Sequence, residues 1–480
     1  MVPFRLFARG GPYHWSPAVA YAHFCKRKAV AMPTNHVASA LSRRDFVKAG
    51  LFAGITVMTA PGVARSYQRN EKLRMACIGA GGRAAAGIGP ALGEHLVAIA
   101  EVDPKGRGKN SIERALKQSP DTKIYTDFRK LFDKHRDLDA VWVGTPDHTH
   151  FSASILAMEN GAGVYCEKPL TWAVNEARIL RDVANKKKLP TQMGNQGHSS
   201  DSIRLICDHL RAGTLGELQE VVCISNRRFS ANDRPASQPV PEGLDWEAWI
   251  GPANYRDYHP GLHPFNWRSW LEYGAGSLGD MGCHTMDGVV WGLNLVDADT
   301  FEVECIEGKP TQEGFPPEAQ IVWRFPARGN LPPVTVKWIH GRKPDRPEWL
   351  PADAPLLAEG TYYVGSKGVM TSGSHCQNVQ LWPESFAKEA PQPPKTVERS
   401  PHGHTGDFLA ACRDRSGPAP SANFDYSARL TEIVLLGNIA CLVGEKLTYD
   451  MRSGRVTNND KANELLARRP RKGWEAGYNL

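Results

Sequence analysis

Short apolar runs alternate with segments of helical character between residues 73 and 193. The runs expected to be buried strands are residues 73–78, 96–102, 139–144 and 163–166. The segments expected to be helices are residues 84–92, 149–160 and 175–187. Such alternation is typical of a parallel sheet with helices on both faces. We therefore predict a doubly wound α/β domain with ligands at the carboxyl ends of its strands.

A glycine-rich turn directly follows the first predicted strand. It reads Gly79-Ala80-Gly81-Gly82-Arg83-Ala84 and leads into a helix of small residues. A strand, a glycine turn and a helix in this order form the dinucleotide-binding pattern, in which the glycines allow a tight turn and a close approach to a pyrophosphate. We therefore predict a Rossmann domain whose cofactor contacts include Gly79, Gly81, Gly82 and Arg83.

An acidic residue ends the second predicted strand. Asp103 lies 24 residues after Gly79, near the spacing at which a carboxylate binds the ribose hydroxyls. A carboxylate there repels a 2′-phosphate, so the sequence favours NAD over NADP. Asp103 could instead cap the helix expected to begin near Pro104, and Arg107 leaves NADP open.

Two polar loops follow the third and fourth predicted strands. They read Thr145-Pro146-Asp147-His148-Thr149-His150 and Glu167-Lys168-Pro169. Because both lie where a parallel sheet binds ligands, we add their residues to the predicted cofactor site: Thr145, Pro146, His150, Glu167 and Lys168. Glu167 and Lys168 could instead form a surface ion pair.

The second half of the chain contains an unusual concentration of aromatic residues. A helix is expected at 203–212, a strand at 218–225 and an amphipathic core helix at 426–442. Between them lie Trp246, Trp249, Tyr255, Tyr258, His259, His263, Phe265, Trp267, Arg268 and Trp270. Aromatic faces can stack on sugars while Tyr and Arg bind hydroxyls, so we predict Tyr258 and Arg268 as substrate contacts. An aromatic core or a subunit interface explains the same residues equally well.

Four motifs in this order resemble one known family. They are the glycine turn, TP-x-x-x-H at 145–150, EKP at 167–169 and G-x-x-x-D-x-G-x-H in the segment that ends at His284. The chain resembles the glucose–fructose oxidoreductase, inositol dehydrogenase and MocA family over about residues 72–450. The resemblance implies a second α+β domain with an open, mostly antiparallel sheet, and substrates that are sugars or cyclitols. It also implies proton transfer by Lys168 and His284 and substrate binding by Asp280.

The residue chemistry agrees with these roles. Oxidation of a secondary alcohol needs a base for the hydroxyl proton; a lysine in a desolvated cleft and a histidine can both serve. Asp280 and His284 are four residues apart and share a face if the segment is helical. They could instead be a helix cap and a core histidine, and Asp287 is expected to be structural. Asn195 and Gln196 could bind nicotinamide or sugar hydroxyls, or simply form a turn; His198 is a weaker candidate.

The N-terminal segment carries the pattern of an export signal. Ser42-Arg43-Arg44-Asp45-Phe46-Val47-Lys48 precedes an apolar run at 49–60 and small residues at 62–64, which resembles a twin-arginine signal. Met32 is an alternative start. We divide the chain into a signal at 1–64, a cofactor domain at 72–197, a substrate and oligomerisation domain at 198–450 and a C-terminal tail at 451–480.

Charge and cysteine content exclude several function classes. The net charge of +7 is that of residues 1–64, which hold eight basic residues and one acid. The neutral remainder gives no reason to expect nucleic acid as a partner. The ten cysteines show no CxxC or CxxH spacing, so we predict neither a disulfide framework nor a metal site.

The sequence therefore predicts an exported NAD(P)-dependent oxidoreductase acting on a sugar, a cyclitol or a related polyol. Its expected partners are a small carbohydrate, the twin-arginine export machinery and further copies of the chain in a homo-oligomer. One alternative is an NAD-dependent glycosidase that oxidises its substrate transiently and eliminates the aglycone. Another is a non-catalytic sugar-binding protein.

Overall fold

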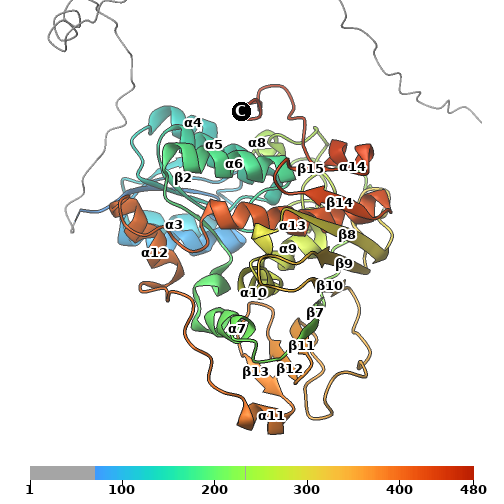
Figure 1. The fold of residues 1–480 in the computed structure, drawn as a ribbon. Helices are drawn as coiled ribbons and strands as arrows, with labels where there is room; N and C mark the ends of the chain where they lie inside the picture. The colour runs from blue at the N-terminus through green and yellow to red at the C-terminus, as the bar shows by residue number, and fades with distance from the viewer. Residues whose placement is uncertain (1–70, 233) are drawn as a thin grey trace, which may run out of the picture. The chain divides into compact units, whose positions relative to one another are not determined.

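The computed structural model describes residues 71–232 and 234–480. The predicted export signal at residues 1–64 lies outside the described residues. Two sheets organise the described chain, one of six strands and one of nine (Figure 1).

The six-stranded sheet is parallel throughout, with the order β3-β2-β1-β4-β5-β6. Its strands are β1 Arg74–Ile78, β2 His95–Ala100, β3 Lys123–Tyr125, β4 Ala140–Val143, β5 Gly163–Cys166 and β6 Thr191–Met193. Its helices are α2 Ile88–Gly93, α3 Lys109–Gln118, α4 Phe128–Lys134, α5 Asp147–Glu159 and α6 Val174–Lys187. The strand order reverses between β1 and β4, which is the arrangement of a Rossmann domain. The predicted fold class of this domain is confirmed.

Two predicted boundaries in this domain differ from the structure. The helix expected at 84–92 begins as a 3₁₀ turn, Gly82–Gly87, and becomes α-helical only at α2. Strand β2 ends at Ala100, two residues before the predicted end. The carboxylate of Glu101 there turns to the glycine loop and accepts the N–H groups of Ala80 and Gly81, so the chain leaves the sheet at this residue.

The nine-stranded sheet has the order β13-β12-β11-β7-β10-β9-β8-β14-β15. Its strands are β7 Leu218–Ser225, β8 Thr300–Glu307, β9 Ala319–Phe325, β10 Val334–His340, β11 Gly360–Gly365, β12 Val369–Ser372, β13 Gln380–Trp382, β14 Leu447–Asp450 and β15 Arg455–Val456. Only the pair β7–β10 is parallel among the described pairings. The prediction of an open, mostly antiparallel sheet is confirmed.

The helices of the second domain are α7 Asp201–Arg211, α8 Trp246–Ile250, α9 Gly276–Thr285, α10 Asp287–Gly292, α11 Glu384–Glu389, α12 Gly403–Arg413, α13 Phe424–Val443 and α14 Asp460–Leu465. Of these, α9 contacts β7 and α11 contacts β13. The long helix α13 packs against α6, α9, β8 and β9, and so spans both domains (Figure 1). By length and composition α13 could cross a membrane, but 78% of its most apolar stretch is buried inside the protein, as expected of a core helix.

The segment 451–480, predicted as a tail, is part of the fold. It forms β15 and α14, and its last residues pack on the cofactor domain: the Trp474 ring lies 5.7 Å from Phe128, and the Tyr478 ring 4.5 Å from Phe151. Helix α12 likewise buries Phe408 against the Rossmann sheet. These contacts join residues several hundred positions apart, so local sequence patterns could not reveal them.

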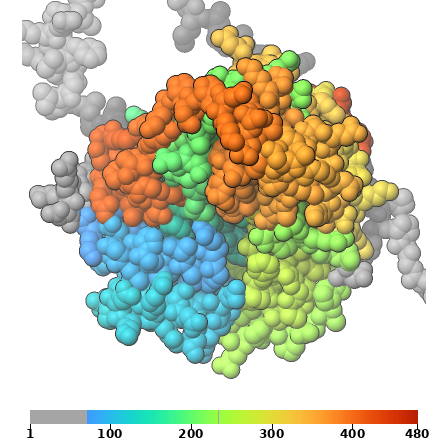
Figure 2. All heavy atoms as spheres, turned by 90° about the horizontal axis from the view of Figure 1, so that it is seen from below, coloured from blue at the N-terminus to red at the C-terminus, as the bar shows by residue number. Residues whose placement is uncertain are grey.

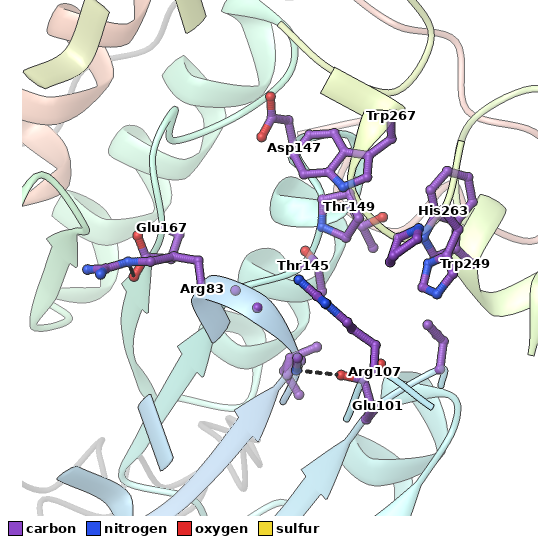
Figure 3. A pocket seen from close by; sticks show the side chains of 18 of the residues that line it. Arg83, Glu101, Arg107, Thr145, Asp147, Thr149, Glu167, Trp249, His263 and Trp267 are labelled. Atoms are coloured by element: carbon purple, nitrogen blue, oxygen red, sulfur yellow. Dashed lines mark hydrogen bonds and ion pairs between the residues drawn. The ribbon is translucent and has the colours of Figure 1, made fainter. Parts of the chain in front are cut away.

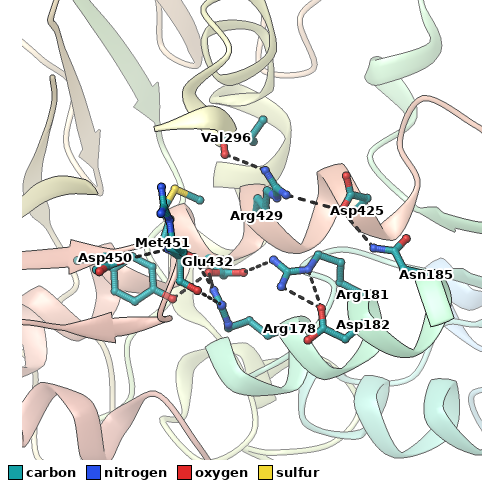
Figure 4. A network of polar contacts seen from close by, with 12 residues as sticks. Arg178, Arg181, Asp182, Asn185, Val296, Asp425, Arg429, Glu432, Asp450 and Met451 are labelled. Atoms are coloured by element: carbon teal, nitrogen blue, oxygen red, sulfur yellow. Dashed lines mark hydrogen bonds and ion pairs between the residues drawn. The ribbon is translucent and has the colours of Figure 1, made fainter. Parts of the chain in front are cut away.

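A buried charge network also joins the two domains (Figure 4). Glu432 of α13 is fully buried and accepts hydrogen bonds from Arg178 Nη1 at 2.9 Å and from the Tyr449 hydroxyl at 2.8 Å. Arg178 also donates to the carbonyl oxygens of Met451 and Arg452. The network therefore ties α6 of the cofactor domain to α13 and to the turn after β14.

Candidate active site

A cavity of about 370 Å³ opens at the carboxyl ends of β1, β2, β4 and β5. Figure 2 shows a hollow where the blue cofactor domain meets the yellow-green part of the second domain. Of the predicted site residues, the cavity is lined by Gly79, Gly81, Gly82, Arg83, Thr145, Pro146, His150, Glu167, Lys168 and Arg268. Folding therefore brings together three separate sequence motifs and five residues of the aromatic tract, namely Trp249, His263, Phe265, Trp267 and Arg268.

The glycine turn forms one wall of the cavity under tight steric constraint. Gly79 has φ +94°, a conformation that favours glycine. A Cβ at Gly81 would lie 2.6 Å from Cγ of Arg107. The turn thus needs glycine at both positions, and it leaves its backbone close to the cavity.

Asp103, predicted to bind the ribose, does not line the cavity. Its carboxylate accepts the N–H groups of Gly106 and Arg107 and lies 3.2 Å from Nε2 of His263. Asp103 therefore caps the turn before α3, the alternative that the sequence left open, and its contact with the ribose stays a prediction. Of the two acids after β2, Glu101 is the one that lines the cavity (Figure 3).

The room beside the glycine turn and the polar atoms of the lining both suit a bound dinucleotide. The glycine turn leaves room where side chains would fill it, and Glu101 and Arg107 lie on the same side (Figure 3). Among the described residues, three buried polar atoms of the lining have no hydrogen-bond partner: Thr145 Oγ1, Glu167 Oε2 and His263 Nδ1. Buried polar groups without partners are uncommon, so these atoms suit a bound polar ligand.

Residues of the second domain cover part of the cavity. Trp249, His263 and Trp267 face the glycine turn across it (Figure 3). His150 joins the two loops of the cofactor domain, because its ring nitrogens lie 2.8 Å from the carbonyl oxygens of Thr145 and Pro169. Burial lowers the pKa of His150 to about 4, so the ring is neutral at physiological pH and holds the loops in place.

Lys168, Asp280 and Arg268 form a charged cluster at one end of the cavity. Lys168 Nζ donates to Oδ1 of Asp280 at 2.9 Å and to its backbone oxygen at 2.6 Å. Arg268 Nε lies 3.3 Å from the same Oδ1. Burial alone would raise the pKa of Asp280, but Lys168 and Arg268 together hold it well below its usual range. Asp280 is therefore ionised, and two cations flank it.

His284 lies on the same helix as Asp280, as predicted, because α9 includes both residues. Its side chain is buried, and its Nδ1 has no partner among the described residues. Burial and the positive charge of Lys168 hold the pKa of His284 well below its usual range. The ring is thus a neutral imidazole beside a lysine ammonium.

Two family models match most of these elements. The NAD-binding Rossmann-fold model of the Gfo/Idh/MocA oxidoreductases matches residues 73–195, and the model of their C-terminal α/β domain matches residues 226–324. The chain belongs to the Gfo/Idh/MocA family of oxidoreductases.

Similar proteins carry the same family features. The rhizopine catabolism protein MocA of Rhizobium meliloti is 28% identical over 155 residues, 32% of this chain and 38% of that protein. The levoglucosan dehydrogenase of Pseudarthrobacter phenanthrenivorans is 24% identical over 163 residues, 34% of each chain. The chain thus spans little more than a third of these curated relatives. The WlbA dehydrogenase of Chromobacterium violaceum, solved with NADH and UDP-GlcNAcA, shares the fold at a TM-score of 0.54 and 15% identity, over 80% of this chain and 98% of that one.

The Gfo/Idh/MocA site holds a carboxyl group that sequence reasoning missed. Asp147 lines the cavity, is buried, and accepts the N–H of Ala275 just before α9 (Figure 3). Burial raises its pKa to about 7, against the opposing charges of Arg268 and Lys168. The position of Asp147 inside the motif at 145–150 could have identified it as a site residue. Its pKa near neutrality depends on burial, which the motif does not reveal.

Four predicted substrate contacts do not line this cavity: Asp280 and His284, which lie on α9 beside Lys168, and also Tyr258 and Gln196. Tyr258 is buried in an aromatic cluster, edge-on to Trp246 at 5.1 Å, so the interpretation of this tract as a core is correct for Tyr258. Gln196 does not line the cavity and donates to the hydroxyl of Tyr165 at 2.9 Å. Both side chains are committed to packing or to internal hydrogen bonds.

The residues around Gln196 also have internal roles in this protein. Asn195 Nδ2 donates to Asp287 at 2.8 Å, His198 Nδ1 lies 3.0 Å from the same carboxylate, and the Tyr426 hydroxyl donates to it at 2.6 Å. All of these contacts are buried or nearly so. Asp287 is therefore structural, as predicted, and links the loop after β6 to α10 and α13.

Proposed function

We propose that this chain is an NAD(P)-dependent oxidoreductase that transfers a hydride at a secondary alcohol of a sugar, cyclitol or related polyol. One observation carries the proposal: the ion pair of Lys168 and Asp280 lies at the end of a dinucleotide-type cavity, beside the neutral imidazole of His284. An alcohol oxygen bound there would meet both a hydrogen-bond donor and a proton acceptor. The dehydrogenase names of the relatives support this reaction class.

We propose NAD as the cofactor. The glycine turn and Arg83 would hold the pyrophosphate, and Glu101 would bind the adenosine ribose. The carboxylate of Glu101 disfavours a 2′-phosphate, whereas Arg107 on the same side would attract one. NADP is therefore the alternative cofactor, and a binding measurement must compare the affinities for NAD and NADP.

The chain's own residues would manage the hydroxyl proton. When bound, the dinucleotide supplies the hydride acceptor. Two of the three N–H donors of Lys168 are used on Asp280, which leaves the third for the substrate oxygen. His284, neutral at physiological pH, can accept the hydroxyl proton as the ketone forms. Asp280, fixed by Lys168 and Arg268, can accept a hydrogen bond from a neighbouring hydroxyl.

A direct test begins with the cofactor. Purified mature protein would be denatured and the released nucleotide identified by mass. Folded protein with added NAD⁺ or NADP⁺ would then be supplied with sugars and cyclitols, and absorbance at the reduced nicotinamide band followed. Net formation of NADH or NADPH from a polyol supports the proposal. Release of an aglycone from a glycoside without net reduction of the nucleotide would instead indicate the glycosidase reaction.

We also propose that the chain is exported by the twin-arginine route, on the basis of the motif at 42–48. The double substitution Arg43→Lys and Arg44→Lys conserves charge but removes the recognised pair. We expect the precursor to accumulate in the cytoplasm, as shown by cell fractionation and immunoblotting. Normal export of the double variant would refute this route.

A homo-oligomer is the remaining proposal about partners, and it rests on the family resemblance. Light scattering coupled to size-exclusion chromatography would measure the mass of the assembly. A mass equal to one chain of 52.9 kDa, or less after cleavage of the signal, would refute it.

A further inference from the structure

A second histidine faces His284 from a strained loop. The loop at residues 373–378 connects β12 to β13, and two of its non-glycine residues have positive φ: Cys376 at +60° and Asn378 at +55°. Such backbone conformations are uncommon outside glycine, and they persist only where surrounding contacts enforce them. Strained residues of this kind concentrate at functional sites, so the side chain that this loop presents is of interest.

Three contacts enforce the loop's position against α9 and the loop after β6. Thr285 Oγ1 donates to the carbonyl oxygen of Ser374 at 3.1 Å, and Cys376 Sγ donates to the carbonyl oxygen of His284 at 3.3 Å. A Cβ at Gly197 would lie only 2.3 Å from the carbonyl oxygen of His375. The loop is therefore fixed to the backbone of His284 and to the side chain of Thr285.

The consequence is a close pair of imidazole rings. The ring centroids of His284 and His375 lie 4.2 Å apart, with 32° between their planes. His284 is almost fully buried, whereas His375 belongs to the exposed residues. Nδ1 of His375 is anchored by the hydroxyl of Ser374 at 3.1 Å. The more exposed ring thus covers the buried one.

We propose that His375 is a positioning residue for His284, held on the strained loop so that its ring keeps His284 neutral and oriented beside Lys168. This inference rests on the proposed oxidoreductase function, in which His284 must be neutral to accept the hydroxyl proton. As pH falls, the exposed ring gains its proton first, because it loses less hydration on charging. The charge on that ring then opposes a second charge on His284, and the two rings titrate as a coupled pair.

His375 adds to burial and to the charge of Lys168, both of which already disfavour a proton on His284. His284 also faces Lys168 and Arg83, both cationic, and Asp280, which is already bound to Lys168 and Arg268. His375 faces Lys168, Arg83 and Arg227 together with one acid, Glu359. Arg227 is itself 3.5 Å from Glu359. Among the described residues, therefore, no uncommitted carboxylate faces His284 to stabilise its protonated form.

The test compares the titration of His284 with and without the second ring. Protein labelled at histidine ¹³Cε1 would be titrated from pH 8 to pH 4 and followed by NMR, with the His284 signal assigned through His284→Asn. We expect His375→Asn to move the onset of His284 protonation upwards by about 1 pH unit, as expected from removing one like charge at this distance. His375→Gln gives a second neutral variant in case the first does not fold. The exposed His402, replaced by Asn, is the matched control and should leave the onset unchanged.

The outcomes separate this inference from the proposed function. An onset at the same pH in the wild type and both His375 variants overturns the role of His375, whatever the turnover. An upward shift supports it, as does an acid limb of kcat/KM that moves upwards by the same amount while turnover above pH 8 is kept. Failure of the wild type to oxidise any polyol would overturn the oxidoreductase function and leave the NMR result standing.

Discussion

Of the ion pairs that join the cofactor domain to the second domain, two with the same geometry differ in what surrounds them. Lys168–Asp280 and Arg178–Glu432 both have an N–O distance of 2.9 Å. Arg178 also donates hydrogen bonds to two backbone carbonyl oxygens, and Glu432 is fully buried. Lys168 and Asp280 each keep 13% of their side-chain surface exposed, and Lys168 lines the cavity.

The electrostatic contrast follows from these surroundings. Burial raises the pKa of Glu432 despite Arg178, whereas Lys168 and Arg268 hold that of Asp280 well below its usual range despite burial. In the first pair only Glu432 is closed within the packing, because Arg178 keeps 16% of its side-chain surface exposed. In the second pair Asp280 remains charged beside a cavity. Two salt bridges of the same length thus differ in role. Arg178–Glu432 is structural, whereas Lys168–Asp280 lies where a ligand can reach it.

Loss of Lys168 should have the largest effect on turnover. We expect Lys168→Ala and His284→Ala each to lower kcat by about 10²–10⁴, as for removal of a general acid or base, with the nucleotide still bound. Because both residues act on one proton path, the double variant should be little slower than the slower single variant. Steady-state kinetics on a confirmed substrate measures both effects.

Lys105→Ala is a matched control, because this lysine is 74% exposed and pairs with Glu242 on the surface. It should keep wild-type turnover. Wild-type turnover in Lys168→Ala would show that the open ion pair has no catalytic role, even if the fold and family are correct.

Loss of Glu432 should act on stability and not on chemistry. Removing one partner of a buried ion pair costs about 3–5 kcal/mol, so Glu432→Ala should lower the free energy of unfolding by that amount in chemical denaturation. Asp182→Ala, which removes a 66% exposed partner of Arg181, should cost less than about 1 kcal/mol. Equal losses in the two variants would contradict the distinction between closed and exposed pairs.

The buried carboxyl group of Asp147 should make the stability of the protein depend on pH. Its pKa is about 7 in the folded protein and about 3.9 in an unfolded chain. Between these values the folded state binds the proton more tightly, so stability falls as pH rises from about 4 to 7. Asp147→Asn keeps an acceptor for Ala275 N–H and removes the buried charge.

We therefore expect Asp147→Asn to be more stable than the wild type by about 1–3 kcal/mol at pH 8 and nearly equal to it at pH 4. Thermal unfolding at several pH values measures the difference. A stability difference that stays constant with pH would show that Asp147 does not titrate in this range.

The smallest expected effect concerns the choice of nucleotide. Glu101→Gln keeps an oxygen for the N–H groups of Ala80 and Gly81 but removes the charge. We expect the ratio of the Kd for NADP⁺ to that for NAD⁺ to fall about 10-fold, equivalent to about 1.4 kcal/mol, in calorimetric titrations. Asp103→Asn should leave the ratio within about 2-fold; a larger change would restore Asp103 as the discriminating residue.

The sequence predicted the fold better than it predicted the site. Alternating apolar runs located β1, β4, β5 and helices α5 and α6 within two residues, because burial in a parallel sheet imposes a local pattern. The cofactor-loop residues were found because their motifs directly follow strands. The sequence did not single out Glu101 as a cavity residue, because two carboxylates two residues apart give no local signal of which one faces the cavity.

Contacts between distant parts of the chain could not be predicted for a related reason. Tyr258 and Arg268 lie in the same aromatic tract, yet one packs in the core and the other reaches Asp280. The packing of residues 451–480 on the cofactor domain and the position of His375 over His284 depend on loops that carry no recognisable motif.

The sequence by itself determined the Rossmann domain, the glycine turn and the identity of Lys168, Asp280 and His284 as a potential reacting set. Local periodicity carries the information on the domain and its turn, since it reflects hydrogen bonding and burial over a few residues. The choice of Lys168, Asp280 and His284 came from the resemblance of their motifs to the family. Tertiary structure alone decided which carboxylate faces the cavity and which ion pair is closed. It also set the pKa values of Asp147, Asp280 and His284, because desolvation and charge proximity depend on contacts between residues more than 100 positions apart.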